Sequence, residues 1–100
     1  MNHNKIINFF GKDAKFNHLG IAIKKINSFH SDLEVIHDKI QNVNISFVKC
    51  NDLVIELVEP VNKHSPINSY INKQQTFYHI CFRVPDLNAS IRRAKQFNFT

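Results

Sequence analysis

The chain repeats part of itself at an offset of 61 residues, and this duplication limits the folds that it can adopt. The stretch FNHLGIAIKKIN at 16–27 matches FYHICFRVPDLN at 77–88, with phenylalanine, histidine and asparagine identical at three positions. Each copy has the pattern of a short apolar strand with one histidine near its start, followed by a helix. An internal repeat is direct evidence of architecture, and two copies are too few for a solenoid. We therefore predict two related halves built around a pair of equivalent histidines, His18 and His79.

The length and the composition restrict where such a chain works. One hundred residues allow a single domain with a modest core. The longest apolar runs are strand-length, so no segment is predicted to span a membrane, and residues 1–15 lack the apolar core of a secretory signal. Cys50 and Cys81 match no zinc or redox spacing, so both are expected to be buried free thiols. We expect a reducing, cytoplasmic setting.

The formal charge of +5 suits an anionic partner. Lysines are scattered, however, and the only tight basic cluster is Arg92, Arg93 and Lys95. Nucleic-acid binding would require a basic face with interleaved aromatic residues. We therefore expect neither a nucleic-acid nor a membrane partner, and the cluster is either a solvated helix face or a binding site for the phosphates of a small molecule.

The first repeat strand, 16–23, has one face with little side-chain bulk. Side chains alternate along a strand, so His18 shares its face with Gly20 and Ala22. A histidine next to glycine and alanine leaves space above the sheet, which makes Gly20 and Ala22 candidate substrate contacts.

The next segment has two interpretations. Phe29, Leu33, Ile36 and Ile40 fit helical spacing, which predicts a helix to about residue 40 after a cap at Asn27 or Ser28. Alternatively the helix ends near Asp32 and residues 34–40 form a strand. The periodicity favours the first interpretation and the repeat favours the second, which we prefer.

A β-hairpin is predicted at 43–59, with Asn51 and Asp52 as its two-residue turn. Its second strand carries Glu56 within a run that is otherwise apolar. A carboxylate in such a place is unfavourable unless it is paired or binds a cation, and the two possibilities are an ion pair with Arg83 and a metal ion.

Two further helices are predicted. Ser65 and Pro66 fit an N-cap followed by proline at the first helical position, which opens a linker helix at 65–73. Asp86 is the predicted cap of a second helix. Its apolar stripe comprises Leu87, Ile91, Ala94 and Phe97.

His18, Glu56 and His79 together suggest a metal centre. Histidine and carboxylate are usual ligands of divalent first-row metals, and strands that lie side by side can bring distant residues together. Each residue alone is more often structural, but two repeat-matched histidines and an isolated strand glutamate form a consistent ligand set. An ion held there would polarise a carbonyl group and acidify the neighbouring C–H.

The ordered motifs HLGIAI from His18, QNVNISFV from Gln41, VIELVEP from Val54, SPI from Ser65 and YHICFRV from Tyr78 resemble the vicinal-oxygen-chelate (glyoxalase/bleomycin resistance/dioxygenase) superfamily. The resemblance covers residues 16–98 and is nearest to the methylmalonyl-CoA epimerase-like proteins. It implies paired βαβββ modules around a metal ion such as Co, Mn, Zn or Ni, with His18, Glu56 and His79 as ligands. It also implies metal-assisted isomerisation of an acyl thioester, presented on CoA or on an acyl carrier protein.

The chain departs from that family at several positions. The family's fourth ligand, a glutamate, would lie 61 residues after Glu56 and therefore beyond Thr100, so three C-terminal strands would be missing and the metal could be lost. Tyr78 stands where the epimerases usually have a histidine before the ligand. Ile45 stands where some of them have a carboxylate proposed as the proton-transfer base.

The expected fold is therefore α+β, a curved mixed sheet with helices on the outside. We predict an N-terminal arm at 1–15 and a single glyoxalase-like domain at 16–100, with module one at 16–61, the linker helix at 65–73 and a partial module two at 76–100. An incomplete sheet exposes an edge that recruits strands, so a homodimer is expected. Arg83, Arg92 and Arg93 are candidate substrate contacts, and no catalytic residue is assigned.

The sequence is compatible with three functions. The first is a metal-dependent isomerase or lyase of an acyl thioester. The second is a non-catalytic module that binds a small molecule, and the third is a truncated, inactive half-domain.

Overall fold

The computed structural model describes residues 7–29 and 32–99. Its elements, in chain order, are β1 (Lys15–Ala22), the 3-10 helix η1 (Ile26–Ser28), β2 (Ile36–Asp38), β3 (Val43–Cys50), β4 (Leu53–Pro60), α1 (Asn68–Asn72), β5 (Phe77–Arg83) and α2 (Leu87–Gln96). The chain forms two compact units. The larger unit is Asn17–Cys81, and the smaller combines the described residues of Met1–Phe16 with those of Phe82–Thr100.

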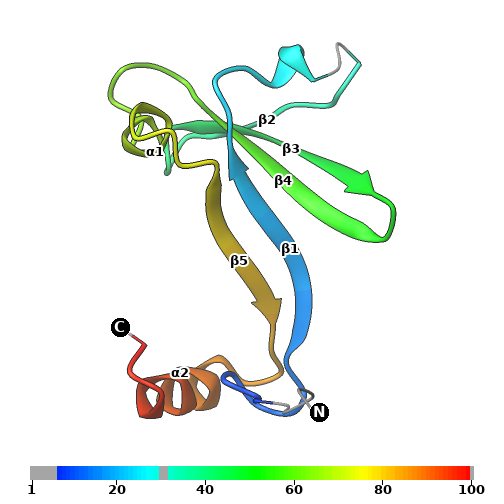
Figure 1. The fold of residues 1–100 in the computed structure, drawn as a ribbon, viewed down its shortest axis with the longest axis vertical. Coiled ribbons are helices and arrows are strands. Elements are labelled where there is room, and N and C mark those ends of the chain that lie inside the picture. Colours follow the sequence, from blue (N-terminus) through cyan, green and yellow to red (C-terminus); the bar gives the residue numbers. More distant parts are fainter. Residues whose placement is uncertain (1–6, 30–31, 100) are drawn as a thin grey trace, which may run out of the picture. The chain divides into compact units, whose positions relative to one another are not determined.

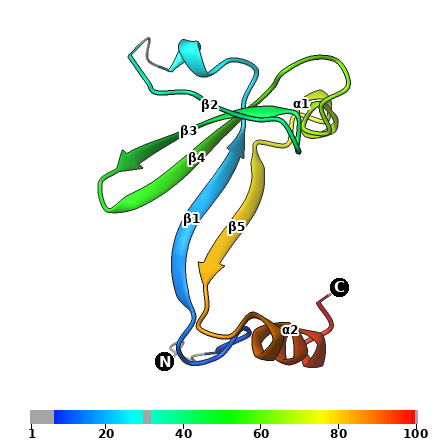
Figure 2. The ribbon, with the colours of Figure 1, turned by 180° about the vertical axis from the view of Figure 1, so that it is seen from behind.

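The strands form one mixed sheet in the order β2-β3-β4-β1-β5 (Figures 1 and 2). Strands β2, β3 and β4 are antiparallel neighbours, whereas β1 runs parallel to β4. The parallel pairing places Gly20 opposite Glu56. The α+β class and the order of the βαβββ module are thus confirmed, with a single 3-10 turn as the helical element of the module.

The predicted hairpin is confirmed as β3 and β4. Cys50 pairs with Leu53, and the intervening Asn51 has a φ of 56°. Asparagine is among the few residues that tolerate this left-handed conformation, which two-residue hairpin turns require. The hairpin register places Phe47 directly opposite Glu56, so this carboxylate has an aromatic neighbour on one side and Gly20 on the other.

The helical periodicity between residues 29 and 40 was misleading. After η1 the described chain next forms the short strand β2, which pairs with β3 through Ile36 and Ile45. The apolar residues that suggested a helix share no buried face, because Ile36 is 48% exposed and Ile40 is 97% exposed. The interpretation with a strand at 34–40 is the better one, although the strand is limited to Ile36–Asp38.

The core of the larger unit lies between β1, the hairpin and the segment around α1. Its buried residues are Ala22, Val43, Val58 and Ile67, with Ile45, Tyr70, Ile71 and Tyr78 packed against them. The predicted cap by Ser65 is wrong, since α1 begins only at Asn68 without a side-chain cap. The hydroxyl of Ser65 is instead buried with no hydrogen-bond partner.

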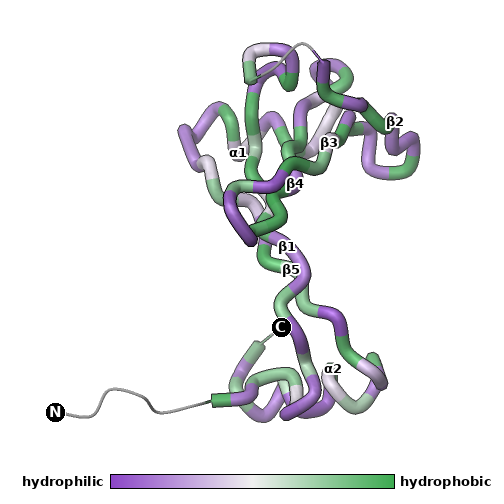
Figure 3. Tube along the Cα trace, turned by 90° about the vertical axis from the view of Figure 1, so that its right-hand side faces the viewer, coloured by the Kyte–Doolittle hydropathy of each residue, from purple (hydrophilic) through white to green (hydrophobic). Residues whose placement is uncertain are grey.

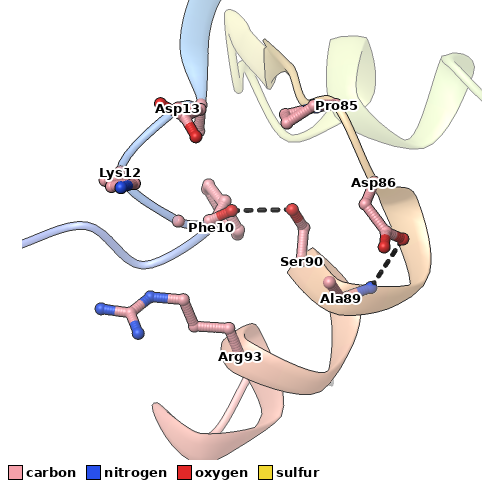
Figure 4. A pocket seen from close by; sticks show the side chains of 10 residues that line it. Phe10, Lys12, Asp13, Pro85, Asp86, Ala89, Ser90 and Arg93 are labelled. Atoms are coloured by element: carbon pink, nitrogen blue, oxygen red, sulfur yellow. Dashed lines mark hydrogen bonds between the residues drawn. The ribbon is translucent and has the colours of Figure 1, made fainter.

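The smaller unit is built on α2, which contains both hydrophilic and hydrophobic residues (Figure 3). Asp86 caps the helix as predicted, with its Oδ1 accepting a hydrogen bond of 3.1 Å from the Ala89 N–H. The buried residues of α2 are Ser90 and Ala94 rather than the whole predicted stripe. The Ser90 hydroxyl donates to the Phe10 carbonyl at 2.7 Å, as Figure 4 shows.

The exposed residues correct two further expectations. Leu87 is 66% exposed and Ile91 is 43% exposed, so this side of α2 is not buried within its own unit. Cys50 is exposed beside the hairpin turn and Cys81 is only partly buried, so neither side chain is buried as the sequence predicted. No helix in the described ranges is long and apolar enough to cross a bilayer.

The carboxylate of Glu59 on β4 hydrogen-bonds to the first residue of η1 and to β3. Its Oε2 accepts a hydrogen bond of 2.8 Å from the N–H of Ile26, and its Oε1 accepts one of 3.1 Å from Asn44 Nδ2. Ile26 is 1% exposed. Removal of the carboxylate would therefore leave a backbone N–H on a buried residue without its partner.

We expect Glu59→Ala to lower the free energy of unfolding by about 1–3 kcal/mol. Urea titration of the purified protein measures this change, and Glu34→Ala is the matched control because Glu34 is exposed. Equal effects of the two substitutions would show that Glu59 contributes only its charge.

Candidate metal centre

Three neighbouring strands bring His18, Glu56 and His79 together. His18 lies on β1, Glu56 on β4 and His79 on β5, and β1 is the strand between the other two. All three residues belong to the larger unit. The side chains are mostly shielded from solvent, with exposed fractions of 12% for His18, 13% for Glu56 and 32% for His79.

The donor atoms of the three residues face a common point. His18 Nε2 lies 3.0 Å from His79 Nε2, Glu56 Oε1 lies 3.2 Å from His79 Nε2, and the third distance, His18 Nε2 to Glu56 Oε1, is 3.8 Å. Ligand atoms about 2.1 Å from one shared ion lie roughly 3.0–3.4 Å from one another. Two of the three distances already match, and the third requires a small approach of Glu56 to His18.

The donor types also fit a divalent first-row metal. Two imidazole nitrogens and one carboxylate oxygen form a set that such ions accept, and three protein ligands leave coordination positions for water or a substrate oxygen. His18, Glu56 and His79 could each supply one ligand atom, and these atoms lie within 4.8 Å of one another. His18, Glu56 and His79 are therefore a candidate three-ligand set within the described residues.

Gly20 leaves room for the imidazole of His79. A Cβ atom built on Gly20 would lie 2.5 Å from both Cε1 and Nδ1 of the His79 imidazole. The imidazole thus occupies the space that any larger residue on β1 would need. The free space that the sequence predicted above Gly20 is filled by the ligand candidate itself.

Aromatic side chains surround both histidines. The centroid of the Phe47 ring lies 5.6 Å from that of the His18 ring, and the two rings meet edge-on. The centroids of the Tyr78 and His79 rings are 4.9 Å apart. Tyr70 in turn packs edge-on against Tyr78 at 4.8 Å. These contacts restrict the rotation of both imidazoles. The sequence pointed to the histidines but not to this aromatic surround.

Tyr78 is held in its neutral form. Burial, then the phenol of Tyr70, then the carboxylate of Glu56 raise the pKa of Tyr78 above its usual value of 10.0. Each cause disfavours the phenolate, because charge is poorly solvated here and a neighbouring carboxylate repels it. The Tyr78 hydroxyl therefore keeps its proton at neutral pH.

His18 has a polar partner on its far side. Its Nδ1 lies 2.7 Å from Oδ1 of Asn17, the residue immediately before it. Alternation along a strand predicts that Asn17 and His18 point to opposite faces, so no sequence pattern indicates this contact. The short amide reaches Nδ1 because that nitrogen is the one nearer the backbone.

The remaining predicted contacts lie elsewhere. Ala22 belongs to the buried core of the larger unit and is 7% exposed. Arg83, Arg92 and Arg93 belong to the smaller unit, where Arg93 donates to the Asn8 carbonyl and lies over the Phe97 ring. Their roles in substrate binding stay predictions.

The smaller unit also contains a cavity of about 220 Å³ at the start of α2 (Figure 4). It carries charges of both signs, from Lys12 and Arg93 on one hand and Asp13 and Asp86 on the other. Asp86 is engaged in capping α2. This mixture favours no ionic ligand, so the histidine–glutamate cluster is the better candidate site.

We expect Gly20→Ala to destabilise the chain by about 1–3 kcal/mol, because the added methyl group overlaps the His79 imidazole. In a His79→Ala background the same substitution should have almost no effect. Urea unfolding of the four proteins of this double-mutant cycle measures the coupling. A loss of equal size in both backgrounds would show that His79 does not occupy this space.

Comparison with known proteins is consistent with the geometry. Residues 8–100 match the model of the Glyoxalase/Bleomycin resistance protein/Dioxygenase superfamily. The mitochondrial methylmalonyl-CoA epimerase of Mus musculus is 26% identical over a 96-residue alignment, and the match covers 85% of this chain and 54% of that protein. The chain thus spans about half the length of this relative.

Solved structures show the same fold. The hypothetical protein BH1468 from Bacillus halodurans is 28% identical, with a TM-score of 0.69 over 86% of this chain and 70% of that one. A Streptomyces coelicolor methylmalonyl-CoA epimerase in complex with 2-nitronate-propionyl-CoA is 22% identical, with a TM-score of 0.66 over 86% of this chain and 71% of that one. The sequence match over residues 8–100 and the shared fold show that this chain belongs to the Glyoxalase/Bleomycin resistance protein/Dioxygenase superfamily.

Proposed function

We propose that the chain binds a divalent first-row metal ion through His18, Glu56 and His79 and takes part in the isomerisation of an acyl thioester. The observation that carries the proposal is the convergence of these three donor atoms within 4.8 Å of one another. The similarity to methylmalonyl-CoA epimerases supports the reaction class. Co, Mn, Zn and Ni are the candidate ions, since imidazole and carboxylate ligands suit them all.

The environment of Glu56 supports the metal proposal independently. Its strand neighbours Leu57 and Val58 are each 1% exposed, and its own side chain is 13% exposed. A carboxylate so shielded needs a positive partner. Its described ion-pair contacts are to two imidazoles, which are cationic only when protonated, so a divalent ion would supply the charge that the site lacks.

The proposed chemistry is proton exchange at the carbon next to a carbonyl. A bound divalent ion acts as a Lewis acid that lowers the pKa of such a C–H. In this chain His18, Glu56 and His79 would hold the ion, and the rings of Phe47 and Tyr78 pack against the two imidazoles.

The arginines of the smaller unit are the proposed contacts for the phosphates of CoA. Arg83 and Arg92 are exposed, and the net charge of +5 favours the approach of an anionic substrate. A homodimer and a cytoplasmic location remain predictions.

One observation favours a second function. Ile45, at the position where the family resemblance implies a carboxylate base in some epimerases, packs against the buried core. A chain without that base could bind an organic ligand without transforming it. Non-catalytic binding is therefore the second candidate function.

We expect the purified chain to bind close to one equivalent of Co²⁺, Ni²⁺ or Zn²⁺ after chelator treatment and dialysis. Glu56→Gln and His79→Ala should each weaken binding at least 10-fold, whereas His64→Ala should not, because His64 is exposed and outside the site. Isothermal titration calorimetry measures the affinities. Equal affinity in all four proteins would refute the metal centre.

The catalytic proposal is tested by deuterium incorporation. Incubation of methylmalonyl-CoA in D₂O with the metal-loaded chain should introduce deuterium at the carbon beside the thioester, and Glu56→Gln should abolish it. Mass spectrometry follows the exchange. Tight binding of the thioester without exchange would support the second function instead.

A further inference from the structure

We propose that Asn17 is a positioning residue that fixes the tautomer of His18, so that the lone pair of His18 Nε2 is directed at the metal position. The inference deepens the proposed function and rests on it for its consequence. It assigns a role to a side chain that neither the repeat nor the resemblance singles out.

Asn17 and His18 are in direct contact through their side chains. Asn17 Oδ1 lies 2.7 Å from His18 Nδ1, a short hydrogen bond. An amide oxygen can only accept, so Nδ1 must carry the proton. In its neutral form an imidazole has one N–H, so a neutral His18 with its proton on Nδ1 has the lone pair on Nε2.

The imidazoles of His18 and His79 also contact each other. His18 Nε2 lies 3.0 Å from His79 Nε2, and one of these nitrogens must donate. Because the proton of His18 is on Nδ1, the donor is His79. Its Nε2–H lies between two acceptors, His18 Nε2 at 3.0 Å and Glu56 Oε1 at 3.2 Å. These contacts therefore assign opposite tautomers to the two histidines in their neutral forms.

The consequence is a division of labour between the repeat-related histidines. His18 already presents an unprotonated Nε2 and can bind an ion without rearrangement. His79 must first move its proton away from Nε2, because a metal ion and a proton compete for the same lone pair. In metal sites generally, the partner of the second imidazole nitrogen fixes the tautomer, and its loss lowers affinity about 10–100-fold.

The tautomers can be read directly by ¹⁵N NMR of the imidazole nitrogens in the metal-free protein, well above the ordinary imidazole pKa of about 6.5. His18→Gln and His79→Gln variants assign the signals. His37 is an internal reference, since its Nδ1 lies 2.9 Å from Asn44 Oδ1 and it should show the Nδ1–H form in every variant. The wild-type chain should show Nδ1–H for His18 and Nε2–H for His79.

The substitutions separate a tautomer effect from a merely structural one. Asn17→Leu should shift His18 toward the Nε2–H form and weaken Co²⁺ binding about 10–100-fold. Asn17→Asp keeps an acceptor oxygen and should preserve both the tautomer and tight binding. If His18 is Nε2–H in the wild type, or if Asn17→Leu changes neither tautomer nor affinity, the inference is wrong. If the tautomers are as expected but the wild type binds no metal, the assignment of Asn17 stands and the proposed function fails.

Discussion

The carboxylate of Glu56 is the group around which the larger unit is arranged. It lies on a strand whose next two residues are almost completely buried, and its side chain is itself mostly shielded. An isolated charge in such a place is strongly unfavourable. The structure places two imidazoles against it, one from each copy of the internal repeat. The sheet order makes this possible, because β1 lies between β4 and β5 and carries a glycine opposite Glu56.

The two histidines are equivalent in the repeat but are held by different interactions. The residue before His18 is Asn17, which hydrogen-bonds the ring, whereas the residue before His79 is Tyr78, which packs against it. Gly20 adds a steric limit on the His79 side alone. Duplication thus supplies two similar strands, and the residues that precede each histidine give the two imidazoles different hydrogen-bonding and packing environments.

Much of the fold followed from local patterns. The alternation in 43–59 and the Asn51–Asp52 turn predicted β3 and β4, and the repeat predicted β1 and β5. The proximity of His18, Glu56 and His79 was anticipated because repeat-related strands pair in one sheet. These inferences worked because register and face follow from a two-residue period.

Other features depended on tertiary contacts that no local pattern encodes. The helical spacing of Phe29, Leu33, Ile36 and Ile40 is not matched by a buried face, and pairing with β3 determines the conformation of Ile36 instead. The cap predicted for Ser65 failed because the chain turns through Pro66 and Ile67 before α1 begins. The His79 ring over Gly20 and the amide on His18 are likewise contacts whose geometry appears only in three dimensions.

The chain belongs to the Glyoxalase/Bleomycin resistance protein/Dioxygenase superfamily, and methylmalonyl-CoA epimerases are among the proteins similar to it. The central claim for this chain is narrower: three side chains share one ion. Anomalous diffraction from crystals loaded with Co²⁺ tests it most directly. The account predicts one strong peak about 2.0–2.2 Å from His18 Nε2, His79 Nε2 and a carboxylate oxygen of Glu56. A peak at any other place, or none while the three side chains remain in contact with one another, would contradict it.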